Sequence, residues 1–229
     1  MVEVLAPPYR PTAATAEFWP WANTLTATSP LTRDQQTIAY PGVLWRATLT
    51  LPPMEETDWR GWSAFLASLS GAAGRFNVRV PHAKAPFGQA LPAQWLFDDG
   101  FGFDDGFGFF DPPHTVTIRD DVASTMILFR TEGWGASVKV LSKGDFVSWS
   151  RVNRRMMAIL KKDAVSDADG NADLQLAFPA PEIPPAGRRL YPWWPTVTMR
   201  LADDDQATQT YGEARIAQIA IQAIEASPL

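Results

Sequence analysis

The residues best suited to chemistry are acidic side chains in two glycine-containing turns. Residues 97–109 contain the tandem repeat Phe-Asp-Asp-Gly-Phe-Gly, which places carboxylates at Asp98, Asp99, Asp104 and Asp105. Paired carboxylates and backbone oxygens suit a hard cation such as Ca²⁺, but this Asp spacing matches no calcium-loop motif. The alternative is an acidic surface turn with its Phe side chains tucked beneath it. The surface turn is favoured, and the sequence leaves open whether the repeat binds a metal, a glycan or nothing.

The second acidic turn, residues 167–171, has the sequence Asp-Ala-Asp-Gly-Asn. If Gly170 occupies the invariant glycine of an EF-hand loop, Val165 falls at the first position and Leu176 at the last, where Asp and Glu are required. That mismatch excludes an EF-hand and predicts a β-turn instead. We therefore assign no metal-ligating residue in this sequence.

Other catalytic groups are scarce. The chain has no Cys and two His, which excludes a cysteine nucleophile, a thiolate zinc site and a polyhistidine metal site. His82 lies in a Pro-flanked loop and His114 precedes an expected strand; neither has a Ser or Cys motif beside it, so both are expected at the surface. A carboxylate pair could hydrolyse glycosides, but nothing indicates which two carboxylates face each other. We predict no catalytic residue, no cofactor and no enzyme activity.

Tryptophan is the residue type that most needs a role, because the chain has ten. Trp59 and Trp62 share an apolar stripe with Leu66 and Leu69 at helical spacing, so they are expected in the core. A second aromatic group lies in Pro-rich segments that lack a core of their own: Phe18, Trp19, Trp21, Trp193 and Trp194. Aromatics in such segments are good anchors for another subunit; packing against the chain's own β-structure is the alternative.

The elements that would position these groups are mostly short strands. Residues 43–51 and 75–80 alternate apolar and polar side chains, which is typical of strands with one solvated face in an antiparallel sheet. Further strands are expected at 115–119, 125–130, 136–141, 145–150, 156–160, 172–178 and 197–201, and the ambiguous segment 213–226 is also interpreted as a strand. One helix is expected over residues 57–70, with Thr57 or Asp58 as its N-cap and Gly71 at its C-cap.

Together these elements predict a mainly β fold, an antiparallel β-sandwich or barrel with one short helix and Pro-rich arms. Residues 1–35 are expected to be an extended N-terminal arm, and residues 36–229 a β-rich domain with a second β module at about 95–180. No apolar run is long enough for a membrane-spanning helix. Glu3 stands where a signal peptide needs basic residues, so we expect synthesis in a cytosol without export by that route.

Several segments carry a resemblance to a known family. They are residues 42–52 (Gly-Val-Leu-Trp-Arg-Ala-Thr-Leu-Thr-Leu-Pro), the helix through Trp62 and Leu66, and residues 69–76 (Leu-Ser-Gly-Ala-Ala-Gly-Arg-Phe), followed by 133–135, 141–146 and 167–179. Over roughly residues 40–205 this layout resembles the distal tail proteins, or closely allied minor tail proteins, of long-tailed bacteriophages. The tandem Asp-Asp-Gly repeat is not part of that layout.

The resemblance implies a structural virion protein of the phage tail, made in the host cytoplasm. It implies a β-sandwich belt that assembles as a ring, expected to be a hexamer, at the distal end of the tail tube, where it joins the tube to the tip or baseplate. Its implied partners are further copies of the chain, the tail tube protein, tip or hub proteins and the tape measure protein, with DNA only passing through the lumen and no membrane. No catalysis is implied.

The net charge of −5 argues against non-specific binding to DNA and suggests an acidic lumen along which DNA slides. Two other functions stay open from the residues. One is a carbohydrate-binding β-sandwich module that stacks sugars on exposed Trp, with Ca²⁺ at the Asp repeat. The other, less favoured, is a hydrolase with a carboxylate pair.

Overall fold

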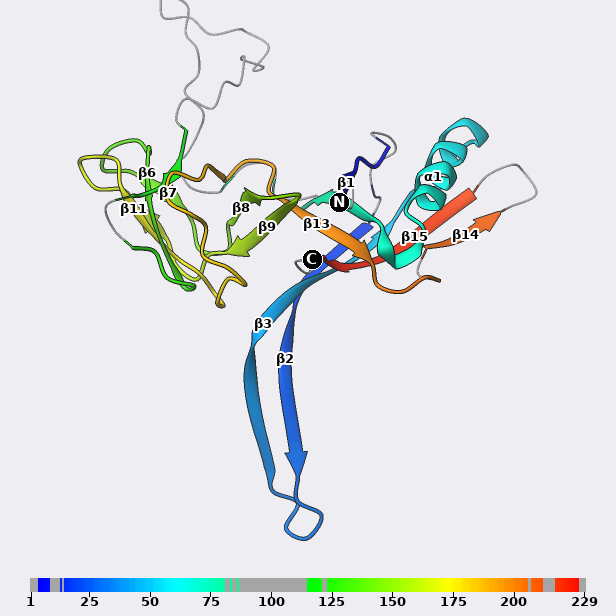
Figure 1. Cartoon of the computed structure of the whole chain (residues 1–229), viewed down its shortest axis with the longest axis horizontal. Coiled ribbons are helices and arrows are strands. Elements are labelled where there is room, and N and C mark those ends of the chain that lie inside the picture. The colour runs from blue at the N-terminus through cyan, green and yellow to red at the C-terminus, as the bar shows by residue number, and fades with distance from the viewer. Residues whose placement is uncertain are drawn as a thin grey trace, which may run out of the picture.

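A computed structural model describes residues 4–8, 13, 15–80, 83, 86, 115–120, 123–205, 207–211 and 217–226. Over these residues the chain is mainly β, with one α-helix and mostly antiparallel sheets, which confirms the predicted fold class (Figure 1). The sheets do not close into a barrel. The tandem repeat at 97–109, Trp95 and both histidines lie outside the described residues, so the predictions for them stay predictions.

The largest sheet has seven strands in the spatial order β1-β4-β13-β15-β3-β2, with β14 also paired to β15. Their bounds are β1 Val4–Leu5, β2 Thr15–Thr28, β3 Gln35–Thr50, β4 Arg75–Arg79, β13 Thr196–Leu201, β14 Ala207–Tyr211 and β15 Ala217–Glu225. Only the β1–β4 pair is parallel. Since β13 and β15 lie between β3 and β4, the strand–helix–strand order does not make a βαβ unit. The strand predictions at 43–51, 75–80 and 197–201 are confirmed, and the one at 213–226 is confirmed from Ala217 onward, since residues 213–216 lie outside the described residues.

The helix α1, Glu56–Ser68, covers one face of this sheet. Trp62, Phe65 and Leu66 are buried in the same core as the inward side chains of β3, and Trp59 packs against that core, so the predicted apolar stripe is confirmed. The predicted caps are wrong. Glu55 is the N-cap and makes no side-chain cap bond, while Leu69, in a right-handed conformation, is the C-cap.

The left-handed backbone expected after the helix begins one residue earlier than predicted. Ser70 has a φ of 54° and Gly71 a φ of 70°. A short 3₁₀ turn, η1 (Gly71–Ala73), follows. A Cβ on Gly74 would come within 2.3 Å of the Leu69 carbonyl oxygen, so the chain turns tightly over the end of the helix into β4.

A second core lies in three smaller sheets. They comprise β10 (Ala164–Val165) with β7 (Lys139–Leu141); β11 (Ala172–Gln175), β6 (Leu128–Glu132) and β5 (Thr117–Ile118); and β12 (Leu190–Tyr191), β8 (Phe146–Arg151) and β9 (Arg154–Ile159). Phe129 and Trp149 meet at its centre, with ring centroids 5.1 Å apart. Strands are confirmed in all six segments predicted between 115 and 178, although most have shifted bounds. The division into an arm over 1–35 and a second module at about 95–180 stays a prediction.

The predicted turn at 167–171 is confirmed. The Asp167 carboxylate accepts the backbone N–H groups of Asp169 and Asn171 and the side-chain amide of Asn171. Gly170 has a φ of 78°, and a Cβ there would lie 2.4 Å from the Trp134 carbonyl oxygen. These hydrogen bonds lower the pKa of Asp167, and they occupy the carboxylate with local backbone, as a turn requires.

Candidate interaction site

The feature that stands out from the fold is a long hairpin formed by β2 and β3 (Figure 1). β15 pairs with β3 only between Arg46 and Thr50. Beyond Arg46 the two hairpin strands pair only with each other, through Trp21 opposite Leu44 and then from Asn23 opposite Tyr40 to Thr28 opposite Gln35. The hairpin therefore has a root inside the sheet and a projecting half, which we define as residues 21–44.

The projecting half exposes large apolar side chains. Trp21 is 46% exposed, and the cross-strand partners Leu25 and Ile38 are 53% and 44% exposed. A two-stranded ribbon on its own is marginally stable in water, and apolar side chains gathered on a surface mark interaction sites. The projecting half therefore has the properties of a segment that is completed by a partner.

The tip of the hairpin is an ordered turn. The backbone N–H of Ser29 donates to the Asp34 carbonyl (2.9 Å), and the Arg33 N–H donates back to the Ser29 carbonyl (3.0 Å). Arg33 has a left-handed φ of 60°, and the Ser29 hydroxyl accepts the Thr32 N–H. This turn presents Leu31, which is 93% exposed, at the end of the projection.

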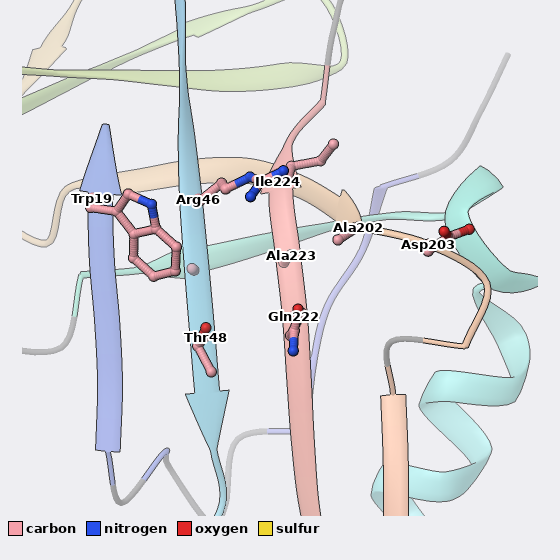
Figure 2. Close-up of a pocket in the computed structure, with 9 residues that line it drawn as sticks. Trp19, Arg46, Thr48, Ala202, Asp203, Gln222, Ala223 and Ile224 are labelled. Carbon is pink, nitrogen blue, oxygen red and sulfur yellow. The ribbon is translucent and has the colours of Figure 1, made fainter. Parts of the chain in front are cut away.

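At the root of the hairpin the outer face of the sheet is hollowed (Figure 2). The hollow, of about 280 Å³, is lined by Trp19 from β2, Arg46 and Thr48 from β3, Gln222 from β15 and Asp203 after β13, among others. Trp19 lies opposite Arg46 in the ladder. The hollow is open to solvent. Its lining includes the guanidinium of Arg46, the carboxylate of Asp203 and the indole of Trp19, but it contains no carboxylate pair and no nucleophile.

Arg46 links this hollow to the projecting half. Its guanidinium carbon lies 3.7 Å from the centre of the Trp21 ring, a cation–π contact. Cross-strand partners share a face of a sheet, so Trp19 and Trp21 lie on the face that carries Arg46 and Leu44. One face of the hairpin thus carries two exposed indoles with an arginine stacked on one of them.

The structure separates the five aromatic residues predicted as anchors into different settings. Phe18 is partly buried against the first core, on the face of β2 opposite to Trp19. Trp19 and Trp21 are 38% and 46% exposed on the hairpin. Trp193 is partly buried against the second core, whereas Trp194 is 48% exposed. The fold brings Trp19 and Trp21 together, away from the segment of Trp193 and Trp194; contact with another subunit stays a prediction for all five.

The sequence of the projecting half contains a pattern that favours a strand. Residues 15–28, expected to be part of an extended arm, form β2 because β3 supplies their hydrogen-bonding partners. Thr24, Thr26 and Thr28 alternate there and favour a strand, but the surrounding prolines outweighed them. Pro20 is accommodated because β2 is an edge strand, where a missing N–H is tolerated.

Glu225 is a buried carboxyl group that the sequence analysis did not single out. It is 3% exposed, and one oxygen accepts the backbone N–H of Trp45 at 3.2 Å. Burial raises its pKa to about 7, opposed by that hydrogen bond and by the charge of Arg154. Its signal was an acidic residue at an inward position of a strand whose other inward residues are Ile219, Ile221 and Ala223.

Within the described ranges, no group of three or more His, Cys, Asp or Glu side chains is placed to hold a metal ion. None of the helices found there is long and apolar enough to cross a membrane. No protein-family model matches the chain, and no curated protein matches it. Proposals about its function therefore rest on its sequence and its geometry.

Proposed function

We propose that this protein is a structural component of a virion, a ring subunit at the distal end of a phage tail tube that joins the tube to the tip or baseplate. The observation that supports this most directly is the projecting half of the β2–β3 hairpin, with Trp21, Leu25, Leu31 and Ile38 exposed. In a ring, each copy uses one surface to bind a different surface of the next copy. A projecting element with apolar side chains supplies one of these two surfaces.

The partners in this proposal follow the resemblance of the sequence. Further copies of the chain form the ring, proposed as a hexamer, with the tail tube protein on one side and tip or hub proteins on the other. The tape measure protein and DNA occupy the lumen, and no reaction is catalysed. A strongly basic lumen in the assembled ring would contradict the part of the proposal in which DNA slides without binding.

The direct test is to remove residues 22–43, which are all of the projecting half except the Trp21–Leu44 pair. Trp21 and Leu44 are cross-strand partners, so an Asn-Gly pair between them makes a two-residue hairpin turn and leaves the root intact. We expect the natural chain to form a ring-sized oligomer by light scattering after size exclusion, and the shortened chain to remain folded as a monomer. A natural chain that is monomeric at every concentration, or a shortened chain that still forms the ring, overturns the proposal.

A matched pair of variants separates apolar contact from simple loss of strand propensity. Leu25→Ser with Ile38→Ser removes a cross-strand apolar pair, whereas Thr26→Ser with Thr37→Ser changes the adjacent pair, whose hydroxyl groups lie 3.3 Å apart. We expect the first double variant to weaken assembly and the second to leave it unchanged. Equal effects would show that the apolar side chains are not what the partner binds.

Carbohydrate binding is the second candidate, favoured by the position of Trp19 and Trp21 on one face of the hairpin. Sugars stack on open indole rings, but Arg46 already lies over the ring of Trp21. If this function is correct, the protein is a stable monomer that is retarded on a glycan column, and Trp19→Ala with Trp21→Ala abolishes the retardation. A ring that shows no retardation favours the structural function.

A further inference from the structure

A second surface, distinct from the hairpin, gathers three arginines around two aromatic rings. We call it the arginine–aromatic surface; it consists of Arg79, Arg155, Arg189, Tyr191 and Trp194. The guanidinium carbons of Arg155 and Arg189 lie 4.8 Å and 5.3 Å from the centre of the Tyr191 ring. That of Arg79 lies 5.4 Å from the centre of the Trp194 ring.

The strands that carry these residues come together at the start of β13, which Figure 1 shows beside β8 and β9. Arg79 is the cross-strand partner of Thr196, whose hydroxyl donates to the Trp194 carbonyl at 2.8 Å. Thr198 is two residues further along the same face of β13, and its hydroxyl accepts the backbone N–H of Arg155 at 2.7 Å. Arg79 and Arg155 therefore flank one short stretch of β13, and Trp194 lies two residues before the strand begins.

The charges on this surface are not neutralised from within the described residues. The ion pairs found there use other arginines, namely Arg60, Arg130, Arg151 and Arg154. A guanidinium that lies over an aromatic ring keeps its N–H groups at the edge of its plane, where they can bind a carboxylate in bidentate fashion. Three such groups together make a binding surface for an anionic segment.

Trp194 adds an exposed aromatic side chain, held by its backbone, that a partner can contact. It is 48% exposed and has a left-handed φ of 53°, an outlier for a bulky side chain. Residues with such strained backbone conformations cluster at binding sites and other functional sites, where the surrounding structure maintains the strain. Arg, Trp and Tyr are also the residue types enriched among the energetically dominant contacts of protein interfaces.

The opposite end of β13 has the opposite charge. Asp203, Asp204 and Asp205 follow the strand after Ala202, and all are exposed. We call these three residues the Asp run. The Asp204 carboxylate accepts the Ala72 N–H at 2.9 Å, which holds the run against η1. Figure 1 shows β13 passing from the second core toward this turn, so one strand carries a basic surface at its start and an acidic one at its end.

We propose that the arginine–aromatic surface of one copy binds the Asp run of the next copy. The inference rests on the proposed ring and adds a second contact to the one made by the hairpin. Because the two surfaces lie at opposite ends of one strand, they do not pair with each other within a single copy, and the contact is head-to-tail, as a ring requires. The net charge of −5 and the occupied ring faces disfavour nucleic acid as the ligand.

The test is a charge reversal on each side and then on both. Arg79→Glu with Arg189→Glu, and separately Asp203→Lys with Asp205→Lys, are each expected to weaken assembly on the order of 100-fold in sedimentation velocity. The chain carrying all four substitutions is expected to recover most of the loss. The natural chain should assemble more weakly at about 500 mM than at about 50 mM NaCl, because salt screens exposed charges.

Two controls keep the result interpretable. Lys161→Glu with Lys162→Glu makes the same charge change at exposed positions between β9 and β10 and should leave assembly unchanged. Arg79→Gln with Arg189→Gln removes the charges without adding acids, and its circular dichroism spectrum and thermal midpoint report whether the fold is intact. A weakened but folded Gln variant supports the proposal.

The outcomes separate this inference from the ring itself. If the natural chain forms a ring that the Asn-Gly shortening abolishes, but neither reversal nor salt weakens it, the charged contact is wrong and the ring stands. If the natural chain binds a roughly 20-nucleotide single strand, and Arg79→Glu with Arg189→Glu abolishes that binding while leaving assembly unchanged, the surface binds nucleic acid instead. If each double reversal weakens assembly but the chain with all four substitutions does not recover it, the proposed pairing of the arginine–aromatic surface with the Asp run is also wrong.

Discussion

The root and the projecting half of the β2–β3 hairpin are made of the same two strands, yet apolar side chains are buried in the root and exposed in the projecting half. In the root, Trp45, Ala47 and Leu49 are buried in the first core, on a strand that pairs with β15. In the projecting half, Leu25 and Ile38 are exposed although they face each other across the same ladder. Apolar strand residues are therefore buried only where a third strand and a covering layer meet them, and the projecting half lacks both within the described structure.

Trp45 defines the boundary between the root and the projecting half. The β15 ladder on β3 ends with Ile224 opposite Arg46, and the next residue, Glu225, uses its side chain to accept the N–H of Trp45. The Trp45 indole N–H donates to the Met157 carbonyl of β9 at 2.9 Å. Trp45 is thus the point at which the root, the boundary and strand β9 meet, within the first core.

The largest expected effect comes from truncating the root. Trp45 is 2% exposed and its ring lies 5.7 Å from that of Phe146 and 5.5 Å from that of Phe178. Trp45→Ala should lower the free energy of unfolding by about 3–5 kcal/mol in a urea titration. Trp21→Ala, on the projecting half, should change it by less than about 1 kcal/mol. Similar losses in the two variants would contradict the division of the hairpin.

The next effect tests the boundary. Burial raises the pKa of Glu225 from 4.5 to about 7, so the folded state holds its proton more tightly than the unfolded state does. This group therefore costs no stability below about pH 4.5, and it costs progressively more up to about pH 7, where the cost reaches about 3 kcal/mol. Glu225→Gln keeps an acceptor for the Trp45 N–H and removes the charge.

We therefore expect Glu225→Gln to unfold at a higher urea concentration than the natural chain at about pH 8, and at nearly the same concentration at about pH 4. The difference between the two pH profiles isolates the contribution of the Glu225 carboxyl group from those of the other titrating groups.

Arg154→Met, which removes the cation whose charge opposes the rise in the pKa of Glu225, should destabilise the natural chain most at alkaline pH. A variant whose pH profile parallels that of the natural chain would show that Glu225 is not charged at this boundary.

Much of the root could be predicted from sequence, because its pattern and its environment agree. Residues 43–51 alternate, and Trp62, Leu66 and Leu69 recur at helical spacing; both patterns are responses to a single buried face. The helix caps were mispredicted because Glu55 forms the cap with its backbone conformation alone. The projecting half was missed because the prolines around it outweighed the strand signal of the alternating Thr24, Thr26 and Thr28.

The interaction surfaces were predicted less well for a related reason. Trp19 and Trp21 could be named as exposed aromatics from their Pro-rich setting, but Leu25, Leu31 and Ile38 share their types with core residues and are distinguished only by the strands around them. Arg79, Arg155 and Arg189 come from three separate parts of the chain, and register and packing bring them to Tyr191 and Trp194. Local patterns do not encode such long-range placement.

The smallest effect on stability belongs to the tip of the projecting half. Leu31 is 93% exposed, so Leu31→Ser should change the free energy of unfolding by no more than about 0.5 kcal/mol. If the tip is inserted into the next copy, the same substitution should weaken assembly about 10-fold, measured by sedimentation velocity. Val152 on the β8–β9 turn is 80% exposed and supplies the matched control, because Val152→Ser removes another highly exposed apolar side chain, outside the β2–β3 hairpin. Weakening by both substitutions would indicate general loss of apolar surface, whereas weakening by Leu31→Ser alone assigns the docking contact to the hairpin.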